Sequence, residues 1–217
     1  MAPALDLTAT AVVCDMDGTL VDSTAVVEQI WAEFADQYGA DLDEVLRYSH
    51  GRLTSDSVRH FLPPGHDPVA VTAHLDAQEL GRVDGIVEVP GAGAFVLSVR
   101  DAPFAVVTSA SRELARRRMR VAGVPVPEVL VAAEDVAVGK PSPEGYLRAA
   151  ALLGVDPGDC VMFEDAEAGL QAAVASGGRV VVVGGHESAI TDGLPRVEDF
   201  TGLSVSRVDG RIRLQHH

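Results

Sequence analysis

The sequence predicts an α/β protein, a doubly wound parallel sheet with a small α-helical cap inserted after the first strand. Three observations predict it: β-branched apolar runs recur along the chain, helix patterns separate the later runs, and a long helical stretch without such runs follows the first one. Runs that are apolar throughout are typical of strands covered on both faces. Alternation of strands and helices favours right-handed crossovers within one sheet.

The expected strands are short runs rich in valine. A tail over 204–214 has Asp209-Gly210 between alternating residues, which predicts a hairpin. The terminal pair of histidines is set aside, because a native end and the remnant of a tag both fit it. The strands of the main sheet are expected over residues 9–14, 104–109, 128–133, 160–163 and 179–184.

Between the later strands the sequence predicts helices over 111–123, 142–154 and 165–178. The second has Ser142 as its expected N-cap, Pro143 at its first position and Gly154 just past its end.

The inserted stretch consists of helical patterns broken by Pro and Gly near 62–68. Residues 84–93 are expected to lead back to the sheet. We therefore predict an α/β core over 1–20 and 89–217 and a helical cap over 21–88. The cap helices are expected over residues 24–38, 43–49, 54–62 and 67–81.

Composition excludes several classes of function. The chain has 217 residues, 47% of them hydrophobic, and a formal net charge of −15. An acidic surface argues against nucleic acids and anionic membranes as partners. The same charge means that a site for an anionic substrate needs a metal or a local cluster of cations.

The sequence also suggests where the protein works. Cys14 and Cys160 lie in apolar runs, which indicates buried, reduced thiols. The beginning of the chain does not resemble a signal peptide, and no apolar run approaches the roughly 20 residues of a membrane span. We expect a cytoplasmic protein that acts as a monomer.

Polar side chains follow several of the expected strands. Asp15 and Asp17 come after the first run, and Thr108 and Ser109 end the second. Ligands of open α/β sheets bind beyond the carboxyl ends of the strands. Gly18 permits a tight turn and a close backbone approach there. The helix that begins near residues 110–111 is expected to point free N–H groups at the same region, which favours an anion.

Three further residues complete the expected site. Lys140, the only lysine of the chain, lies in the loop after the third run, and Glu164 and Asp165 end the fourth. Clustered carboxylates are tolerated around a hard cation, and Mg²⁺ prefers oxygen ligands. Asp15 and Asp165 are the natural ligands, and Glu164 is expected to take part through a water or to support them. The Lys140 ammonium can neutralise a carboxylate and a phosphate.

Each of these residues, taken singly, has a structural interpretation. The Asp-Met-Asp-Gly run suits a capped turn, Thr108 a strand-end hydroxyl, and Glu164-Asp165 a helix N-cap, while a lone lysine is usually solvated. Their joint occurrence at strand ends, in order, favours a common site.

Four segments resemble the motifs of the haloacid dehalogenase-like hydrolase superfamily, and the stretch between the first two resembles its small helical cap. The segments are DMDGTLVDS (15–23), VVTSA (106–110), VGKPSPEGY (138–146) and FEDAEAGLQAAVASG (163–177).

The resemblance implies phosphoryl transfer in two steps. Asp15 would attack phosphorus and form an aspartyl-phosphate, and Asp17 would act as general acid and then as general base. The backbone carbonyl of Asp17 would join Asp15 and Asp165 as a Mg²⁺ ligand. Thr108 and Lys140, with Gly18 and Ser109 beside them, would hold the phosphoryl oxygens.

The cap segment 48–63 resembles that of sugar and polyol phosphatases, such as 2-deoxyglucose-6-phosphatases, hexitol phosphatases and glycerol-3-phosphatases. His50 and Arg52 would then face the site when the cap closes. Surface or purely structural roles remain alternatives for both. The resemblance implies a small phosphorylated sugar or polyol as substrate.

Other functions within the superfamily fit less well. Asp17 disfavours a dehalogenase, and a cap without lysine disfavours a phosphonate hydrolase. A β-phosphoglucomutase remains the alternative, although Val27 stands where its first cap helix usually carries a histidine. A non-catalytic binding protein on the same fold would be expected to have lost at least one motif.

Overall fold

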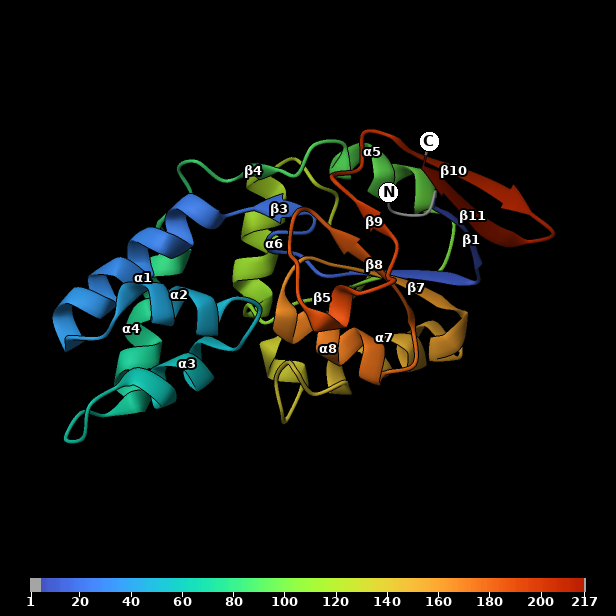
Figure 1. Ribbon diagram of the computed structural model, residues 1–217. Helices are drawn as coiled ribbons and strands as arrows, with labels where there is room; N and C mark the ends of the chain where they lie inside the picture. The colour runs from blue at the N-terminus through green and yellow to red at the C-terminus, as the bar shows by residue number, and fades with distance from the viewer. Residues whose placement is uncertain (1–4, 217) are drawn as a thin grey trace.

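A six-stranded parallel sheet forms the centre of the protein, as the computed structural model shows for residues 5–216 (Figure 1). Each interior strand is a short apolar run whose backbone groups pair with a neighbour on either side. The strands follow the order β6-β5-β2-β7-β8-β9. They are β2 (Ala11–Cys14), β5 (Phe104–Val107), β6 (Val129–Val131), β7 (Cys160–Glu164), β8 (Arg179–Val183) and β9 (Arg196–Val197). The predicted doubly wound α/β class is confirmed.

Helices cover both faces of this sheet. Helices α7 (Glu144–Leu153) and α8 (Glu167–Ala175) pack on the face to which Val13 of β2 points, and they lie together below the sheet in Figure 1. Helices α5 (Ala92–Val99) and α6 (Arg112–Val121) pack on the other face, with Val12. Successive residues of a strand thus enter different cores.

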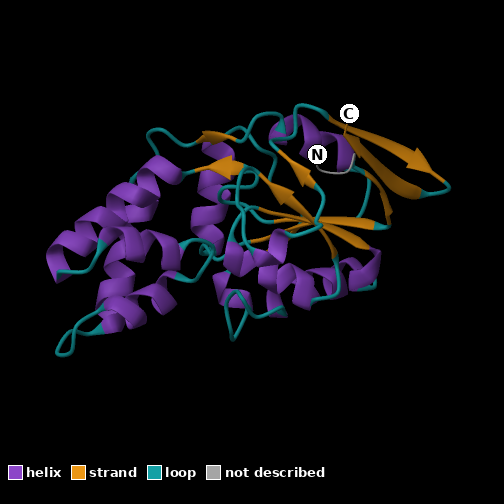
Figure 2. Cartoon of the chain, in the orientation of Figure 1, coloured by secondary structure: helices purple, strands orange, loops and turns teal. Residues whose placement is uncertain are grey.

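A bundle of helices is inserted after β2 and stands to one side of the core, as Figure 2 shows. Its buried side chains include Phe34, Val58 and Leu75. The chain enters and leaves it through a two-stranded ribbon of β3 (Val21–Asp22) and β4 (Val87–Glu88), in which Asp22 pairs with Val87. The bundle helices, hereafter the cap, are α1 (Thr24–Tyr38), α2 (Leu42–Ser49), α3 (Thr54–Phe61) and α4 (Pro68–Gly81).

A second, antiparallel sheet contains the predicted hairpin. Strands β10 (Leu203–Val208) and β11 (Arg211–His216) turn at Asp209-Gly210, and β11 pairs with β1 (Asp6–Ala9). His216, set aside above, belongs to β11, and its N–H donates to Leu5 O at 3.0 Å. The run predicted as one strand over 9–14 is therefore divided, because Ala9 ends β1 and Ala11 begins β2.

Several helix boundaries differ from the prediction. Helix α7 begins at Glu144, and Ser142 accepts a hydrogen bond from the Glu144 N–H rather than serving as the N-cap. Gly154 ends α7 in the left-handed conformation, as predicted. Helix α8 begins at Glu167 and not at Asp165. Helix α5 and the ribbon β3–β4 have no counterpart among the predicted elements. The exact limits of core and cap stay a prediction, and residues 1–4 and 217 lie outside the described residues.

Candidate active site

Three adjacent strands bring their carboxyl ends to one point. Asp15 directly follows β2, Thr108 directly follows β5, and Glu164 is the last residue of β7. Strand β2 lies between β5 and β7, so the side chains that follow it stand at the centre of the sheet edge. The residues of β2 that precede Asp15 are fully buried and apolar. The charged side chains therefore begin only where the strand ends.

Lys140 is buried at this point and pairs with two carboxylates. Its Nζ donates to Oδ1 of Asp15 and to Oε1 of Glu164, and its side chain is only 6% exposed. Burial favours the neutral amine, but the two carboxylates outweigh this effect and raise the pKa of Lys140. The lysine is therefore present as an ammonium beside Asp15, in agreement with its predicted position.

Glu164 has no free acceptor position. Its Oε1 accepts from Lys140 and from the Tyr146 hydroxyl at 2.9 Å, and its Oε2 accepts from the N–H groups of Asp165 and Ala166 at 3.0 and 3.2 Å. A carboxylate offers about four lone-pair sites. Glu164 is thus suited to hold Lys140 and the β7–α8 turn in place, rather than to bind a metal itself.

Asp165 is oriented by two side chains. Its Oδ1 accepts from Thr19 Oγ1 at 3.0 Å, and its Oδ2 lies 2.9 Å from Nε2 of the cap residue His50. The hydrogen bond with Asp165 raises the pKa of His50 against the opposing effect of burial. Gly18, with a φ of 84°, passes so close that a Cβ there would lie 2.0 Å from Asp165 Oδ2. A side chain at position 18 would displace this carboxylate.

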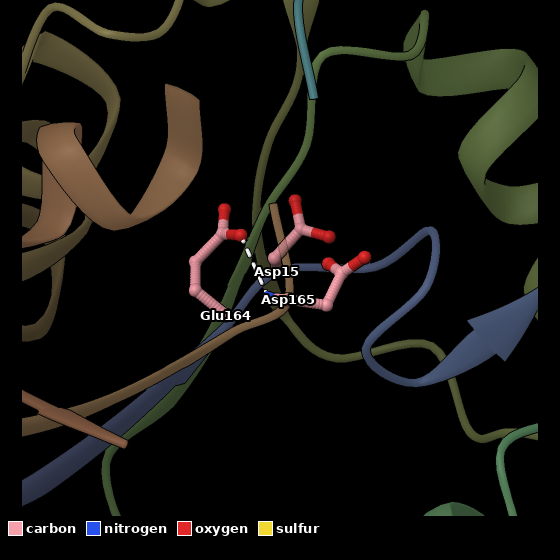
Figure 3. Close-up of side chains that lie close together, drawn as sticks. All are labelled: Asp15, Glu164 and Asp165. Carbon is pink, nitrogen blue, oxygen red and sulfur yellow. Dashed lines mark hydrogen bonds between the residues drawn. The ribbon is translucent and has the colours of Figure 1, made fainter. Parts of the chain in front are cut away.

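The acidic side chains fit a divalent cation. Ligand atoms of Asp15, Glu164 and Asp165 lie within 4.8 Å of one another, and Figure 3 shows the three side chains meeting where β2 and β7 end. Burial, together with Glu164 and Asp165, raises the pKa of Asp15, and Lys140 opposes this effect. A cation between Asp15 and Asp165 would favour their ionised forms, and both offer the hard oxygen ligands that Mg²⁺ prefers.

Asp17 has partners different from those of Asp15. Its Oδ1 accepts from Ser23 Oγ at 2.7 Å and from Nη1 of Arg118 at 3.0 Å. Nη2 of the same arginine donates to Oε2 of Glu79, a buried residue of cap helix α4, at 3.3 Å. Burial raises the pKa of Glu79 to about 7, although Arg118 opposes the shift. One guanidinium thus connects Asp17 with the cap.

The remaining predicted residues line the junction of core and cap. Thr108 Oγ1 accepts from the Ala110 N–H at 3.0 Å, while Ser109 Oγ donates to the carbonyl of Gly51 in the cap at 2.8 Å. Arg52 lies with its guanidinium 4.7 Å from the centre of the Tyr48 ring and its Nη1 3.5 Å from the carbonyl oxygen of Lys140. Cap and core are therefore docked on one another.

A cavity of about 630 Å³ opens between core and cap. Asp15, Asp17, Thr108 and Asp165 line its core side, and Lys140 lies behind Asp15. The structure thus brings together all the predicted site residues, with Glu164 and Lys140 beneath the floor of the cavity. The residues of the cap that line it include Thr24, Glu28, Trp31, His50, Arg52 and Glu79.

Five residues that the sequence analysis did not single out form hydrogen bonds to the acidic side chains of the site or to one another; they are Thr19, Ser23, Glu79, Arg118 and Tyr146. Thr19 belongs to the first motif and could have been singled out there. Ser23 of the first motif and Tyr146 of the third could have been found in the same way. Glu79 and Arg118 carry no comparable signal, because each shares its helix with at least one other residue of the same charge. Only the packing of α4 against α6 shows that Arg118, in the run of arginines at 116–118, is the buried one.

Fold and site together define a capped α/β hydrolase with an acidic, lysine-containing centre. The chain belongs to the haloacid dehalogenase-like hydrolases, whose family pattern matches residues 9–177. This agrees with the resemblance of the four motifs.

Several characterised phosphatases are similar to this chain in sequence. The chain is 43% identical to hexitol phosphatase A of Escherichia coli over 173 residues, which cover 78% of this chain and 80% of that protein. It is 32% identical to glycerol-1-phosphate phosphohydrolase 1 of Saccharomyces cerevisiae, over 82% of this chain and 75% of the relative. It is 33% identical to 2-deoxyglucose-6-phosphate phosphatase 1 of the same yeast, over 75% of each chain.

Solved structures confirm the fold. A β-phosphoglucomutase from Clostridium difficile superimposes with a TM-score of 0.78 over 88% of this chain and 91% of its own. At 20% identity this likeness concerns the fold alone. In the part of the chain that the structure describes, every helix is too short or too polar to cross a bilayer.

Proposed function

We propose that the protein is a Mg²⁺-dependent phosphatase that hydrolyses small phosphorylated sugars or polyols through an aspartyl-phosphate. The observation that carries the proposal is the meeting of Asp15 and Asp165 at the floor of a cavity between core and cap, with Lys140 paired to Asp15 from beneath. The sequence similarity to three phosphatases of phosphorylated polyols and sugars supports this substrate class. We also expect the protein to act as a monomer.

In the first step a carboxylate oxygen of Asp15 attacks phosphorus. A bond forms between that oxygen and phosphorus, while the bond from phosphorus to the bridging oxygen breaks. Asp17 gives its proton to the departing oxygen, which leaves as an alcohol. Lys140, buried beside Asp15, offsets the negative charge that a carboxylate meets at a phosphate dianion.

In the second step water hydrolyses the aspartyl-phosphate. Asp17, now ionised, takes a proton from the water as its oxygen bonds to phosphorus. The bond between phosphorus and Asp15 breaks, and inorganic phosphate and the original carboxylate are regenerated. Asp17 ends the cycle protonated, so the two steps together convert a phosphate monoester and water into an alcohol and phosphate.

Asp15 and Asp165, with the Asp17 carbonyl, are the residues proposed to hold the metal. When bound, Mg²⁺ supplies positive charge that masks the repulsion between nucleophile and substrate. Thr19 and His50 orient Asp165, and Gly18 leaves room for its carboxylate. Glu164 holds Lys140 from behind.

The cap side of the cavity carries both signs of charge, since Glu28 and Glu79 stand there with His50 and Arg52. Carboxylates accept hydrogen bonds from hydroxyl groups, and a guanidinium donates to a hydroxyl or a phosphate oxygen. This lining suits the hydroxyl groups of a sugar or polyol monophosphate. The mutase alternative is separated from hydrolysis by the assay below, which follows both reactions.

The proposal is tested by measuring phosphate release from hexitol phosphates, glycerol phosphates and 2-deoxyglucose 6-phosphate with Mg²⁺. The purified chain is compared with its Asp15→Asn variant, and conversion of hexose 1-phosphate to hexose 6-phosphate is followed in parallel. We expect phosphate release from at least one of these monophosphates, with none from the variant. Abundant isomer conversion without phosphate release would instead establish the mutase.

A further inference from the structure

Arg118 is a buried cation that is paired with a carboxylate of the core and a carboxylate of the cap. It is 2% exposed, lies on α6, and shares its guanidinium between Asp17 of the core and Glu79 of the cap. Its Nε has no hydrogen-bond partner among the described residues. Burying a guanidinium with one unpaired donor is costly, and apolar side chains of similar size often serve stability as well or better. This cost is compatible with a role other than stability, and the geometry around Asp17 supplies one.

The two oxygens of Asp17 are not equivalent. Oδ1 accepts from both Ser23 Oγ and Arg118 Nη1, at 2.7 and 3.0 Å. Within residues 5–216, no hydrogen bond reaches Oδ2, and Asp17 lines the cavity. An oxygen that already accepts from two donors is a poor place for a proton, since the donors' hydrogens would repel it. The transferable proton of Asp17 is therefore expected on Oδ2.

We propose that Arg118 is a positioning residue for Asp17. Together with Ser23 it occupies Oδ1, so that Oδ2 carries the proton that goes to the leaving alcohol. Glu79 of the docked cap holds the guanidinium of Arg118 in this orientation. This inference rests on the proposed function of Asp17 as general acid. It adds a reason why Asp17 acts with one particular oxygen.

Glu79 gives this arrangement a link to the cap. It is 6% exposed and comes from α4, so undocking of the cap would leave Arg118 with Asp17 as its carboxylate partner. A guanidinium free to turn fully towards Asp17 could engage Oδ2 as well, because its N–H groups form a fork that fits both oxygens of a carboxylate. In that state Asp17 would lack a free oxygen for the proton. The closed cap thus keeps the acid ready to act.

The proton is transferred in the same step as before. As the bond between phosphorus and the bridging oxygen breaks, the proton moves from Oδ2 of Asp17 to that oxygen. A poor leaving group such as a sugar or polyol alkoxide needs this proton, whereas p-nitrophenolate leaves without it. Misplacement of Asp17 should therefore slow formation of the aspartyl-phosphate from an alkyl phosphate and spare formation from p-nitrophenyl phosphate.

The test compares Arg118→Met, Arg118→Lys, Glu79→Gln and the wild type, at saturating Mg²⁺, by rapid-quench measurement of aspartyl-phosphate formation. The matched control is Arg117→Met, an exposed neighbour on the same helix. For the best alkyl phosphate we expect Arg118→Met to slow this step about 10- to 100-fold, a fraction of what general acid catalysis contributes. Arg118→Lys should recover part of this rate, and Glu79→Gln should reduce it less than Arg118→Met does. With p-nitrophenyl phosphate as substrate, the rate should change less than about 3-fold in every variant.

Other outcomes would overturn the inference. An equal loss on both substrates, together with a lowered unfolding temperature, would make Arg118 a structural residue, and no loss on either would leave Asp17 independent of it. If Arg118→Met does not fold, the same comparison with Arg118→Lys and Glu79→Gln decides, since unchanged selectivity in both contradicts the proposal. Failure of the proposed function has a different signature, because the wild type itself would then form no aspartyl-phosphate.

Discussion

Asp15 and Asp17 lie two residues apart and are given different chemistry by their partners. Asp15 faces the buried ammonium of Lys140, while Asp17 faces Ser23 and Arg118. A nucleophile must be ionised; burial raises the pKa of Asp15, and the ammonium fixed beside it opposes this shift and favours the ionised form. A general acid must hold and release a proton, which requires one oxygen without donors. The different partners therefore support the different roles proposed for the two carboxylates.

Replacing Asp15 by Asn should abolish turnover and leave the fold intact. The amide nearly preserves the volume of the carboxylate but is not a nucleophile towards phosphorus. Steady-state assays should show no phosphate release, while thermal unfolding should remain cooperative. Residual activity above a few per cent of wild type would reduce Asp15 to a metal ligand and contradict the covalent mechanism.

Arg52→Ala should lower turnover of a sugar phosphate far more than that of p-nitrophenyl phosphate. Arg52 lines the cavity in the cap loop before α3, where it can donate to a remote part of the substrate and help close the cap. Loss of one charge-assisted contact is worth about 1.5–3 kcal/mol, or roughly 10- to 150-fold in rate. The comparison uses kcat/KM for both substrates.

The control for this prediction is Arg47→Ala. Arg47 lies in the neighbouring helix α2, and its side chain is 75% exposed, so both activities should be unchanged. An equal loss on both substrates in Arg52→Ala would place Arg52 in phosphate binding. No loss on either would make it a surface charge.

The candidate site was predictable where a residue type carries its own chemistry. Lys140 stands out as the single lysine, and Asp15 and Asp165 stand out because carboxylates follow apolar strands. Arg118 and Glu79 could not be identified in this way. Their importance arises from a contact between α4 and α6, 39 residues apart in the chain, and neither the spacing nor the type of the two residues indicates it.

At the scale of the elements, the existence of a strand was easier to predict than the strand with which it pairs or the helix that precedes it. The valine-rich runs correspond to β2, β5, β6, β7 and β8. Helix α5 escaped prediction because its sequence, AGAFVLSV, is apolar on all sides and follows Pro90-Gly91, so that it shows no helical periodicity. The pairing of β1 with β11 joins segments about 200 residues apart, and local sequence carries no information about such a contact.

The contact between α4 and α6 should make stability depend on pH. The pKa of Glu79 is raised from 4.5 to about 7, chiefly by burial. The folded state therefore holds this proton more tightly than the unfolded state, and the free energy of unfolding should fall as pH rises from about 4.5 to about 7. The largest decrease in the free energy of unfolding that these two pKa values allow is about 3 kcal/mol.

Chemical denaturation of wild type and Glu79→Gln at pH 5 and pH 8 measures this effect. The variant cannot ionise at position 79, so the wild type should lose stability relative to it at the higher pH. Any constant effect of the altered contact with Arg118 cancels in this comparison. A difference that does not change with pH would show that Glu79 is ionised throughout, and a difference of opposite sign would show that its pKa is lowered.

At the scale of the whole molecule, removal of divalent metal should abolish activity, and Mg²⁺ should restore it. Asp165→Ala should weaken the binding of Mg²⁺, because it removes a proposed ligand and the partner of His50. Binding to the folded state alone raises the unfolding temperature. We expect this rise in the wild type and a much smaller one in the variant. Activity that survives thorough chelation would assign the carboxylates another purpose.

The ribbon β3–β4 has a consequence for how such proteins diversify. Because Asp22 pairs with Val87, the helical bundle begins and ends at neighbouring points, and its removal would leave two chain ends already close together. Insertions with adjacent ends are tolerated well by a folded host. Recombination could therefore exchange the whole bundle as a cassette. A new lining for the cavity would be acquired in one event, while the carboxylates and the lysine at the strand ends remained in place.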